Sequence, residues 1–294
     1  MRSRFQEDPV GITHTFFAAG QATYIRSGEG KILWEFPHPT RDGWVLPSGN
    51  VILAVNRSAK YPNGGAIEVT KDGKVIFEYQ GTQSEVNTVQ DIGKGRLLLT
   101  EAGAKPRLLE VEKKTGEIKV EVLLQAQTKD HHLQTRMSRK LKNGNYLVPQ
   151  LLDKMVREYT PKGDVVWEAK TPDWESPVQN WAFTAIRLDN GNTLTGCTLG
   201  NLVVEFDKAG KVVWSVHNDE LPGKPFNDCC GVQRLPNGNT VVTAHHATKN
   251  EVRLVEITRD KKIVWIHRDP TKPGIHHFQI LDTNGKPLKG RPLK

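Results

Sequence analysis

Apolar and polar residues alternate along the chain in short runs, and the same pattern returns six times. One run is an apolar segment that follows a tight turn and ends in a large residue: Gly30–Trp34, Gly73–Phe77, Gly116–Val120, Gly163–Trp167, Gly210–Trp214 and Lys261–Trp265. A second run, such as AIEVT or LVVEF, precedes it and mixes β-branched, aromatic and polar residues. Alternation with a period of two, bounded by Gly, Asn and Asp, predicts short β-strands.

A glycine turn separates two further strand-like runs in each unit. It reads LPSGN, IGKGR, LKNGN, LDNGN, LPNGN and LDTNGK, with its glycine at Gly49, Gly95, Gly144, Gly191, Gly238 and Gly285. These glycines are spaced by 46, 49, 47, 47 and 47 residues. Asn-Gly between strands predicts a hairpin whose two central residues both have positive φ. Four strands, named A to D in chain order, repeated at this period predict the blades of a β-propeller.

The two ends of the chain each supply part of a unit. Residues 12–36 provide strands B, C and D, and residues 276–288 provide strand A with its turn. We therefore expect an all-β, six-bladed β-propeller of four-stranded antiparallel blades, closed by pairing of the N-terminal strands with the C-terminal strand. Such pairing removes an open sheet edge. The prediction is one domain over residues 1–294, with 1–11 as an N-terminal tail.

Two recurring residue types are expected to be structural. The Trp and Phe side chains that end strand D are expected to pack between blades. A glutamate recurs on strand C, at Glu68, Glu110, Glu158, Glu205 and Glu256. We expect it to make a repeated structural hydrogen bond.

Composition narrows the range of partners. Charged residues make up 25% and apolar residues 37% of the chain, which is typical of a soluble globular protein. The net charge of +8 favours anionic ligands. Because Lys and Arg are scattered, we expect no nucleic-acid partner. No apolar run approaches the ~18 residues of a membrane helix, so we expect no membrane partner. The protein is expected to be a monomer.

The compartment is left open. The first residues lack the apolar core of a signal peptide. The protein is expected to be periplasmic or extracellular if a signal peptide has been removed, and cytoplasmic otherwise.

Candidate chemistry gathers in the long connections between strands. Nine of the ten histidines fall in these connections or at the strand starts beside them. In a propeller blade such connections lie on one face, where function concentrates. We expect the starts of strand A to converge on a central funnel. The residues assigned a catalytic role there are His132, His246, His277 and Arg136.

Further polar residues are expected to bind the ligand in this funnel. They are Arg41, Asp42, Arg57, Asn87, Glu101, Gln134, Trp181, Asp228, Cys229, Cys230, His245 and His276. Imidazoles transfer protons or act as nucleophiles, and arginines hold anionic groups bidentately. The funnel is therefore expected to bind a small polar or anionic substrate that is sulfated, carboxylated or glycosidic.

Paired histidines and paired cysteines raise two more questions. Adjacent residues on a strand face opposite sides, so at most one histidine of each pair at 131/132, 245/246 and 276/277 is expected to face the funnel. His132, His246 and His277 are therefore candidate ligands of a divalent metal, although no cofactor is certain. Cys229 and Cys230 are expected to be half-buried thiols, because a bridge between neighbours needs a distorted peptide. A vicinal disulfide is left open.

The alternation of LPNGN turns with GKVVW strands resembles the quinoprotein-like (PQQ-like) repeat propellers, especially the six-bladed arylsulfotransferase type. The resemblance covers nearly the whole chain. It implies sulfuryl transfer, in which one histidine takes the sulfuryl group while other histidines and an arginine stabilise its charge. His132 and Arg136 match on one strand start, His277 on another, and His246 at the end of a strand B. Quinone binding is not expected, because the acidic metal site of quinoprotein dehydrogenases is absent from the sequence.

Three classes of function remain open. The leading hypothesis is an enzyme, whether a transferase, a hydrolase or a lyase, that uses the funnel histidines. The first alternative is a non-catalytic propeller that binds a ligand or a protein. The second is an oxidoreductase or lyase with a quinone cofactor or a metal. An artificial propeller would also explain the regular repeats.

Overall fold

The computed structural model describes residues 6–173, 180–246 and 251–294, and nearly all regular structure in them is β. Six antiparallel sheets contain four consecutive strands each, or four strands with one added edge strand. They are the blades of a six-bladed β-propeller, so the predicted fold class is confirmed. Contacts divide the chain into two compact units. The first comprises residues 1–39, 173–180 and 186–294, and the second comprises 40–172 and 181–185.

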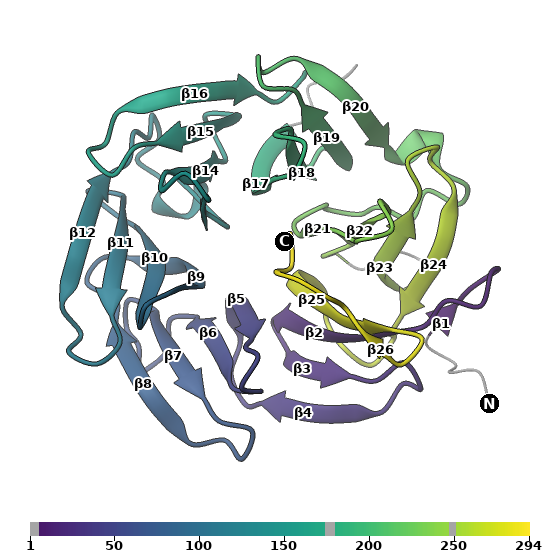
Figure 1. Ribbon diagram of the computed structural model, residues 1–294, viewed down its shortest axis with the longest axis horizontal. Helices are drawn as coiled ribbons and strands as arrows, with labels where there is room; N and C mark the ends of the chain where they lie inside the picture. The colour runs from purple at the N-terminus through teal and green to yellow at the C-terminus, as the bar shows by residue number, and fades with distance from the viewer. Residues whose placement is uncertain (1–5, 174–179, 247–250) are drawn as a thin grey trace. The chain divides into compact units, whose positions relative to one another are not determined.

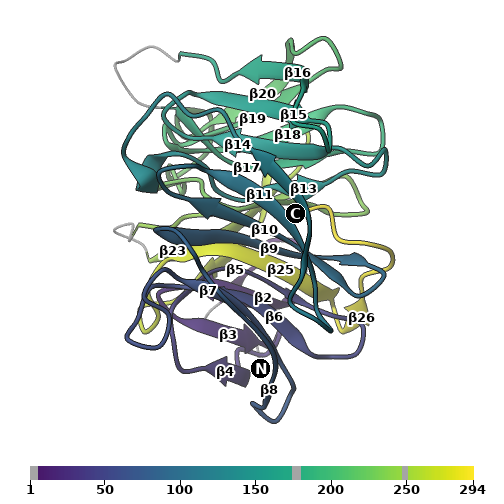
Figure 2. The same cartoon turned by 90° about the vertical axis from the view of Figure 1, so that its left-hand side faces the viewer.

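The second unit contains three sheets whose strands follow chain order (Figures 1 and 2). One is formed by β5 (Thr40–Val45), β6 (Val51–Val55), β7 (Gly65–Val69) and β8 (Val75–Gln80). The next is formed by β9 (Glu85–Gly93), β10 (Arg96–Ala102), β11 (Arg107–Glu112) and β12 (Ile118–Leu123). The third is formed by β13 (Arg139–Lys140), β14 (Tyr146–Gln150), β15 (Met155–Tyr159) and β16 (Val165–Lys170), with the short helix η1 (His131–Leu133) before it.

The first unit contains the other sheets, apart from the middle of β17. One is formed by β17 (Asn180–Arg187), β18 (Thr193–Leu199), β19 (Leu202–Phe206) and β20 (Val212–His217), which leads into the short helix η2 (Asn218–Glu220). The next is formed by β21 (Val232–Arg234), β22 (Thr240–Thr243), β23 (Val252–Ile257) and β24 (Ile263–Arg268). The last is formed by β2 (His14–Gly20), β3 (Thr23–Arg26), β4 (Ile32–Phe36), β25 (Ile275–Thr283) and β26 (Lys286–Pro287).

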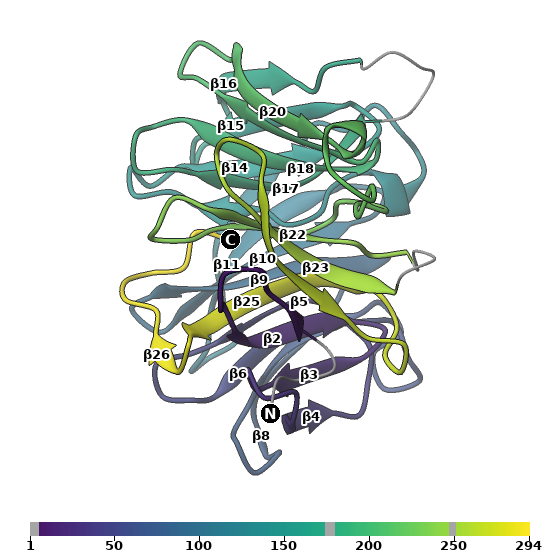
Figure 3. The same cartoon turned by 90° about the vertical axis from the view of Figure 1, so that its right-hand side faces the viewer.

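Both ends of the chain meet in this last sheet, as the sequence predicts. β25 pairs antiparallel with β2 from His14 opposite Thr283 to Gly20 opposite Ile275 (Figure 3). The tail predicted for residues 1–11 contains a short strand that the pattern did not reveal. This strand, β1 (Gln6–Glu7), adds to the outer edge of β24 (Figure 1).

The repeated glycine turns have two forms. In the turns of Gly49, Gly144, Gly191 and Gly238 only the glycine has a positive φ, between 84° and 91°. The prediction of two positive-φ residues is wrong for these four, because each is a longer loop in which a type I turn precedes a left-handed glycine. It is confirmed at the other two turns, where Lys94 and Asn284 also have positive φ.

The strand-C glutamates make the repeated hydrogen bond that the sequence predicts. The asparagine that follows the turn glycine donates to the glutamate at 2.7–2.8 Å in four blades, as Asn50–Glu68, Asn145–Glu158, Asn192–Glu205 and Asn239–Glu256. The fifth of these glutamates, Glu110, instead accepts a hydrogen bond from the Tyr146 hydroxyl at 2.7 Å. Each asparagine bond ties the A–B turn to strand C of its own blade, whereas the Tyr146 bond joins neighbouring blades.

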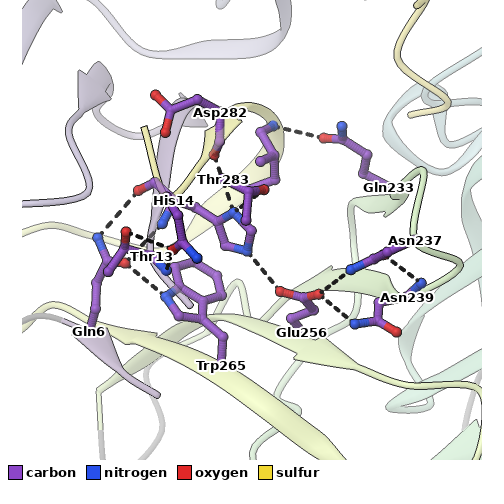
Figure 4. A network of polar contacts seen from close by, with 12 residues as sticks. Gln6, Thr13, His14, Gln233, Asn237, Asn239, Glu256, Trp265, Asp282 and Thr283 are labelled. Carbon is purple, nitrogen blue, oxygen red and sulfur yellow. Dashed lines mark hydrogen bonds and ion pairs between the residues drawn. The ribbon is translucent and has the colours of Figure 1, made fainter. Parts of the chain in front are cut away.

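Glu256 also links two blades of the first unit. His14 lies 2.7 Å from Glu256 through Nε2, and both side chains are fully buried (Figure 4). The ring of His14 meets the Trp265 indole edge-on at 4.6 Å between centroids. Gln6 accepts a hydrogen bond from the Trp265 indole nitrogen at 2.8 Å, so β1 covers this tryptophan.

Three other strand-D tryptophans at the same repeat position are only half-buried: Trp34, Trp167 and Trp214. The predicted packing between blades is therefore complete only for Trp265 and Phe77.

None of the helices in the described part of the chain is long and apolar enough to span a membrane.

Candidate functional site

A carboxylate surrounded by cations lies in the second unit. Glu85, at the start of β9, is 2.9 Å from Arg41 of β5 and 3.0 Å from Nδ1 of His132. Arg136 lies 3.9 Å from the same carboxylate. We call these four residues the Glu85 cluster. Glu85 and Arg136 are buried, whereas the side chain of His132 is 56% exposed.

The short helix η1 positions His132. Asp130 caps this helix by accepting a hydrogen bond from the His132 backbone N–H at 3.0 Å. His131 lies 2.6 Å from the Ser84 hydroxyl through its Nδ1. The two histidines thus reach neighbouring residues, Ser84 and Glu85. The expectation that they face opposite sides is wrong here, because the segment is helical and not extended.

The Glu85 cluster shifts the ionisation of its members. Burial raises the pKa of Glu85, but the hydrogen bond of His132 and the charges of Arg41 and Arg136 outweigh it and lower that pKa to about 2. Burial lowers the pKa of Arg41, and Arg57 adds to this shift while Glu85 opposes it. Glu85 therefore stays ionised at neutral pH. With both arginines protonated, the cluster carries a net positive charge.

Acid is expected to remove the stabilisation that the Glu85 carboxylate provides. A depressed pKa stabilises the fold fully above the unfolded value of 4.5, and this contribution is lost as the pH falls towards about 2. At about 1.4 kcal/mol per pKa unit the shift sets an upper bound of ~3 kcal/mol, which partial exposure of His132 reduces to about 2 kcal/mol. Urea unfolding of wild type and Glu85→Gln tests this. The stability difference between them should narrow between about pH 7 and about pH 3, and an unchanged difference would contradict it.

An unsatisfied amide lies on the same strand as Glu85. Asn87 is fully buried, and its Nδ2 donates to the Thr135 carbonyl at 3.1 Å. Its Oδ1 has no hydrogen-bond partner in the described residues. Residues 85 and 87 are two apart on one strand and share a face of the sheet. A buried carbonyl without a partner is costly, so this oxygen is an acceptor for a ligand or a water.

A second group of polar side chains lies in the first unit. Asp228 precedes β21, His245 and His246 follow β22, and His276 lies on β25. Nδ1 of His246 is 2.8 Å from the Asp228 carboxylate. The His245 ring stacks on His276, with centroids 3.9 Å apart and planes at 18°. We call these residues the Asp228 cluster. Both histidines of the 245/246 pair belong to it, because they lie beyond the end of the strand.

Burial lowers the pKa of His245 to about 4. The charges of His246 and Arg253 contribute to this shift, while Asp228 opposes it. His245 is therefore neutral at neutral pH. His246 differs from it in that its side chain is 60% exposed.

Several other predicted ligand-binding residues are held in structural contacts. Asp42 is buried and pairs with Arg139 at 2.9 Å. Glu101 is buried and accepts from Tyr79, Thr82 and Arg107. The side-chain amide of Gln134 accepts a hydrogen bond from the Gly103 N–H and donates one to the Gly103 carbonyl. Arg57 is exposed and donates to the Pro62 carbonyl, and Trp181 is half-buried.

His277 and the cysteines are also placed inside the first unit. His277 is fully buried, and its Nδ1 is 3.2 Å from the Lys294 amine. Cys197, Cys229 and Cys230 are thiols. All three are fully buried, so the prediction that Cys229 and Cys230 are half-buried is wrong. Burial raises the pKa of Cys229, so this side chain is a neutral thiol and not a thiolate at neutral pH. His132 belongs to the other unit, so a metal site shared by His132, His246 and His277 stays a prediction.

Glu85 and Ser84 were not among the predicted site residues, although the sequence contained a signal for them. Glu85 and His132 are 47 residues apart, as are Ser84 and His131. This separation equals the repeat period, and equivalent positions of consecutive blades lie side by side. No comparable signal marks the contact of Asp228 with His246, which depends on loop conformation.

Several solved structures are similar to this fold. A protein of unknown function from Bacteroides caccae has 23% identity and a TM-score of 0.77, over 90% of this chain and 98% of that one. A catalytically inactive histidine-to-alanine variant of virginiamycin B lyase from Staphylococcus aureus, with quinupristin, has 13% identity and a TM-score of 0.61 over 94% of each chain. A streptogramin B lyase has 13% identity and a TM-score of 0.61 over 91% of this chain and 88% of that one.

At these identities the likeness shows the propeller fold alone. No family model matches the chain, and no curated protein matches it. The resemblance to quinoprotein-like and arylsulfotransferase-type propellers therefore stays a prediction, while the six-bladed β-propeller is confirmed.

Proposed function

We propose that the protein is an enzyme that binds a small anionic substrate at the Glu85 cluster and transfers protons through His132. The observation that supports this most directly is the pairing of Nδ1 of the exposed His132 with the buried carboxylate of Glu85 at 3.0 Å, beside two arginines. A carboxylate that accepts the Nδ1 proton leaves the Nε2 lone pair of the imidazole available as a base.

The arginines supply the binding side of the proposal. Arg41 and Arg136 face one carboxylate between them, and their side chains are 12% and 2% exposed. Charges taken out of water interact more strongly than charges at the surface. A carboxylate or sulfate on the substrate would therefore be attracted to this cluster. The unsatisfied Oδ1 of Asn87 offers an acceptor for a hydroxyl of the same ligand.

Elimination is the reaction that we would test first. Two of the similar structures are lyases, and a histidine variant of one is catalytically inactive. In such a step His132 Nε2 would take a proton from the carbon next to the substrate carboxylate. The C–H electrons would form a double bond, and the leaving group would depart with its bonding electrons. The arginines would stabilise the negative charge that develops on the carboxylate.

A screen for turnover tests the proposal. Wild type would be assayed with carboxylated and sulfated glycosides for the absorbance of a new double bond and for released leaving group. We expect His132→Gln to lower kcat/KM by about 10²–10⁴-fold, since general acid–base groups contribute about that much. The matched control is His38→Gln, an exposed histidine of the first unit, which should leave turnover unchanged. Arg41→Lys should raise KM more than it lowers kcat. Turnover that survives His132→Gln would overturn the catalytic role.

A non-catalytic binding protein is the alternative that the same screen separates. It predicts that an anionic ligand binds to wild type, that Arg41→Lys weakens binding, and that no product forms from any ligand that binds.

A further inference from the structure

The Asp228 cluster brings three donors of a kind that metals use into one place. Asp228, His245 and His246 each offer one ligand atom, and these atoms lie within 4.8 Å of one another. It is the one such group of three in the part of the chain that the structure describes. The group lies outside the Glu85 cluster, and the proposed function does not use it.

The backbone holds these donors in place. His245 N–H donates to the Asp228 carbonyl, and His246 N–H donates to the Asn227 carbonyl, both at 3.1 Å. The segment before β21 is thereby tied to the end of β22. Asp228 has a φ of 73°, a left-handed conformation that is uncommon outside glycine and that occurs often at functional sites.

Neighbouring residues also fix the side chain of Asp228. Its Oδ1 accepts from the backbone N–H of Leu199 at 2.9 Å and from the Thr198 hydroxyl. Its other oxygen, Oδ2, faces His246. Hydrogen bonds to a ligating carboxylate of this kind orient it for a metal. The stacked ring of His276 restricts the rotation of His245 in the same way.

Close packing at Gly274 keeps this arrangement compact. A Cβ atom there would lie 1.4 Å from the backbone oxygen of His245, which no side chain can tolerate. The glycine therefore allows the start of β25, and with it His276, to lie directly against His245.

We propose that Asp228, His245 and His246 bind one divalent transition metal ion, for which Zn²⁺ has the best-matched chemistry. Two imidazole nitrogens and one carboxylate oxygen form a common zinc ligand set, with one position left for water or substrate. Imidazole-rich sites favour Zn²⁺ over Mg²⁺ and Ca²⁺, which prefer oxygen. The metal would lie between Asp228 Oδ2 and His246 Nδ1. Those atoms are 2.8 Å apart and need to separate by only about 0.5 Å to accept an ion ~2.0–2.1 Å from each.

Metal titration of the full-length protein tests this site. The protein would be stripped with a chelator, dialysed and titrated with Zn²⁺ by calorimetry and with Co²⁺ by visible absorption. We expect one ion per chain, and a Co²⁺ spectrum with the intense d–d bands of a tetrahedral nitrogen–oxygen site. His246→Gln and Asp228→Asn should each weaken Zn²⁺ binding by about 100-fold or more, which exceeds the 10–100-fold cost of losing an outer partner. His38→Gln is again the control and should bind like wild type.

Two results would overturn the site. One is that wild type binds no stoichiometric Zn²⁺. The other is that both variants bind it as tightly as wild type, which would indicate surface histidines only. If Asp228→Asn does not fold, His246→Gln and the wild-type Co²⁺ spectrum still decide, because His246 is exposed. The readout is metal binding, so failure of the proposed activity at His132 leaves it unaffected.

Discussion

Replacing Glu256 with alanine is expected to lower the free energy of unfolding by about 3–5 kcal/mol, the cost of removing one partner from a fully buried, hydrogen-bonded pair that includes a carboxylate. Glu256 and His14 are fully buried and 2.7 Å apart, and Asn239 donates to the same carboxylate at 2.7 Å. Alanine would leave the buried imidazole of His14 and the half-buried amide of Asn239 without this acceptor. Denaturant unfolding at neutral pH measures the loss.

The repeat supplies a matched control for this experiment. Glu68 occupies the same position in another blade and accepts from Asn50, but its charged partner Lys113 is 24% exposed. Glu68→Ala is therefore expected to cost only about 1–2 kcal/mol. Equal losses at the two positions would show that the asparagine bond, and not the pair with His14, carries the effect.

The contribution of Glu256 to the free energy of unfolding is also expected to depend on pH. Burial raises its pKa, but the hydrogen bond and the charge of His14 outweigh this and lower it below its usual value. A depressed carboxyl pKa stabilises the fold above the unfolded pKa, and this stabilisation is lost as the pH falls through the folded pKa. The stability difference between wild type and Glu256→Gln should therefore shrink in acid.

Replacing Trp265 with alanine is expected to lower the free energy of unfolding by about 3–5 kcal/mol as well, the range for removing a buried aromatic ring. Trp265 is fully buried, meets His14 edge-on, and donates to Gln6. Its loss would leave a cavity and remove one of the hydrogen bonds that hold β1 against β24. Amide hydrogen exchange should therefore show faster exchange of Gln6 and Glu7 in the variant.

Trp214 provides the control, because it occupies the equivalent position in the preceding blade. It is half-buried, and within the described residues its sheet has no strand added beyond β20. Trp214→Ala is expected to cost clearly less, about 1–2 kcal/mol. A similar loss at Trp214 would mean that burial by β1 contributes little. Because His14 touches both Glu256 and Trp265, the double variant should not show the sum of the single losses.

The fold was predictable because its signal is repeated. Six glycine turns with a nearly constant period, and complementary partial units at the two ends, predicted the blades and the pairing of β2 with β25. The strand β1 was missed because two paired residues carry no periodic pattern. The form of the LPNGN turns was missed because the Asn-Gly pair alone does not give the loop length.

The candidate site was predictable only in part, for a different reason. Residue type singled out His132, Arg41, Arg136, Asp228, His245 and His246, and the structure divides them between two clusters. Residue type could not separate Asp228, which faces a histidine, from Asp42, which is committed to the buried Arg139. Their partners depend on side-chain direction in irregular segments. Whether the two clusters serve one substrate stays a prediction.

The pairing of β2 with β25 also determines when the last blade can fold during synthesis of the chain. β2 leaves the ribosome long before β25, because His14 pairs with Thr283, which lies 269 residues further along the chain. Until that partner emerges from the exit tunnel, β2 presents an unpaired edge to its surroundings. A chain stalled before Ile275 would therefore remain open to aggregation or to chaperone binding.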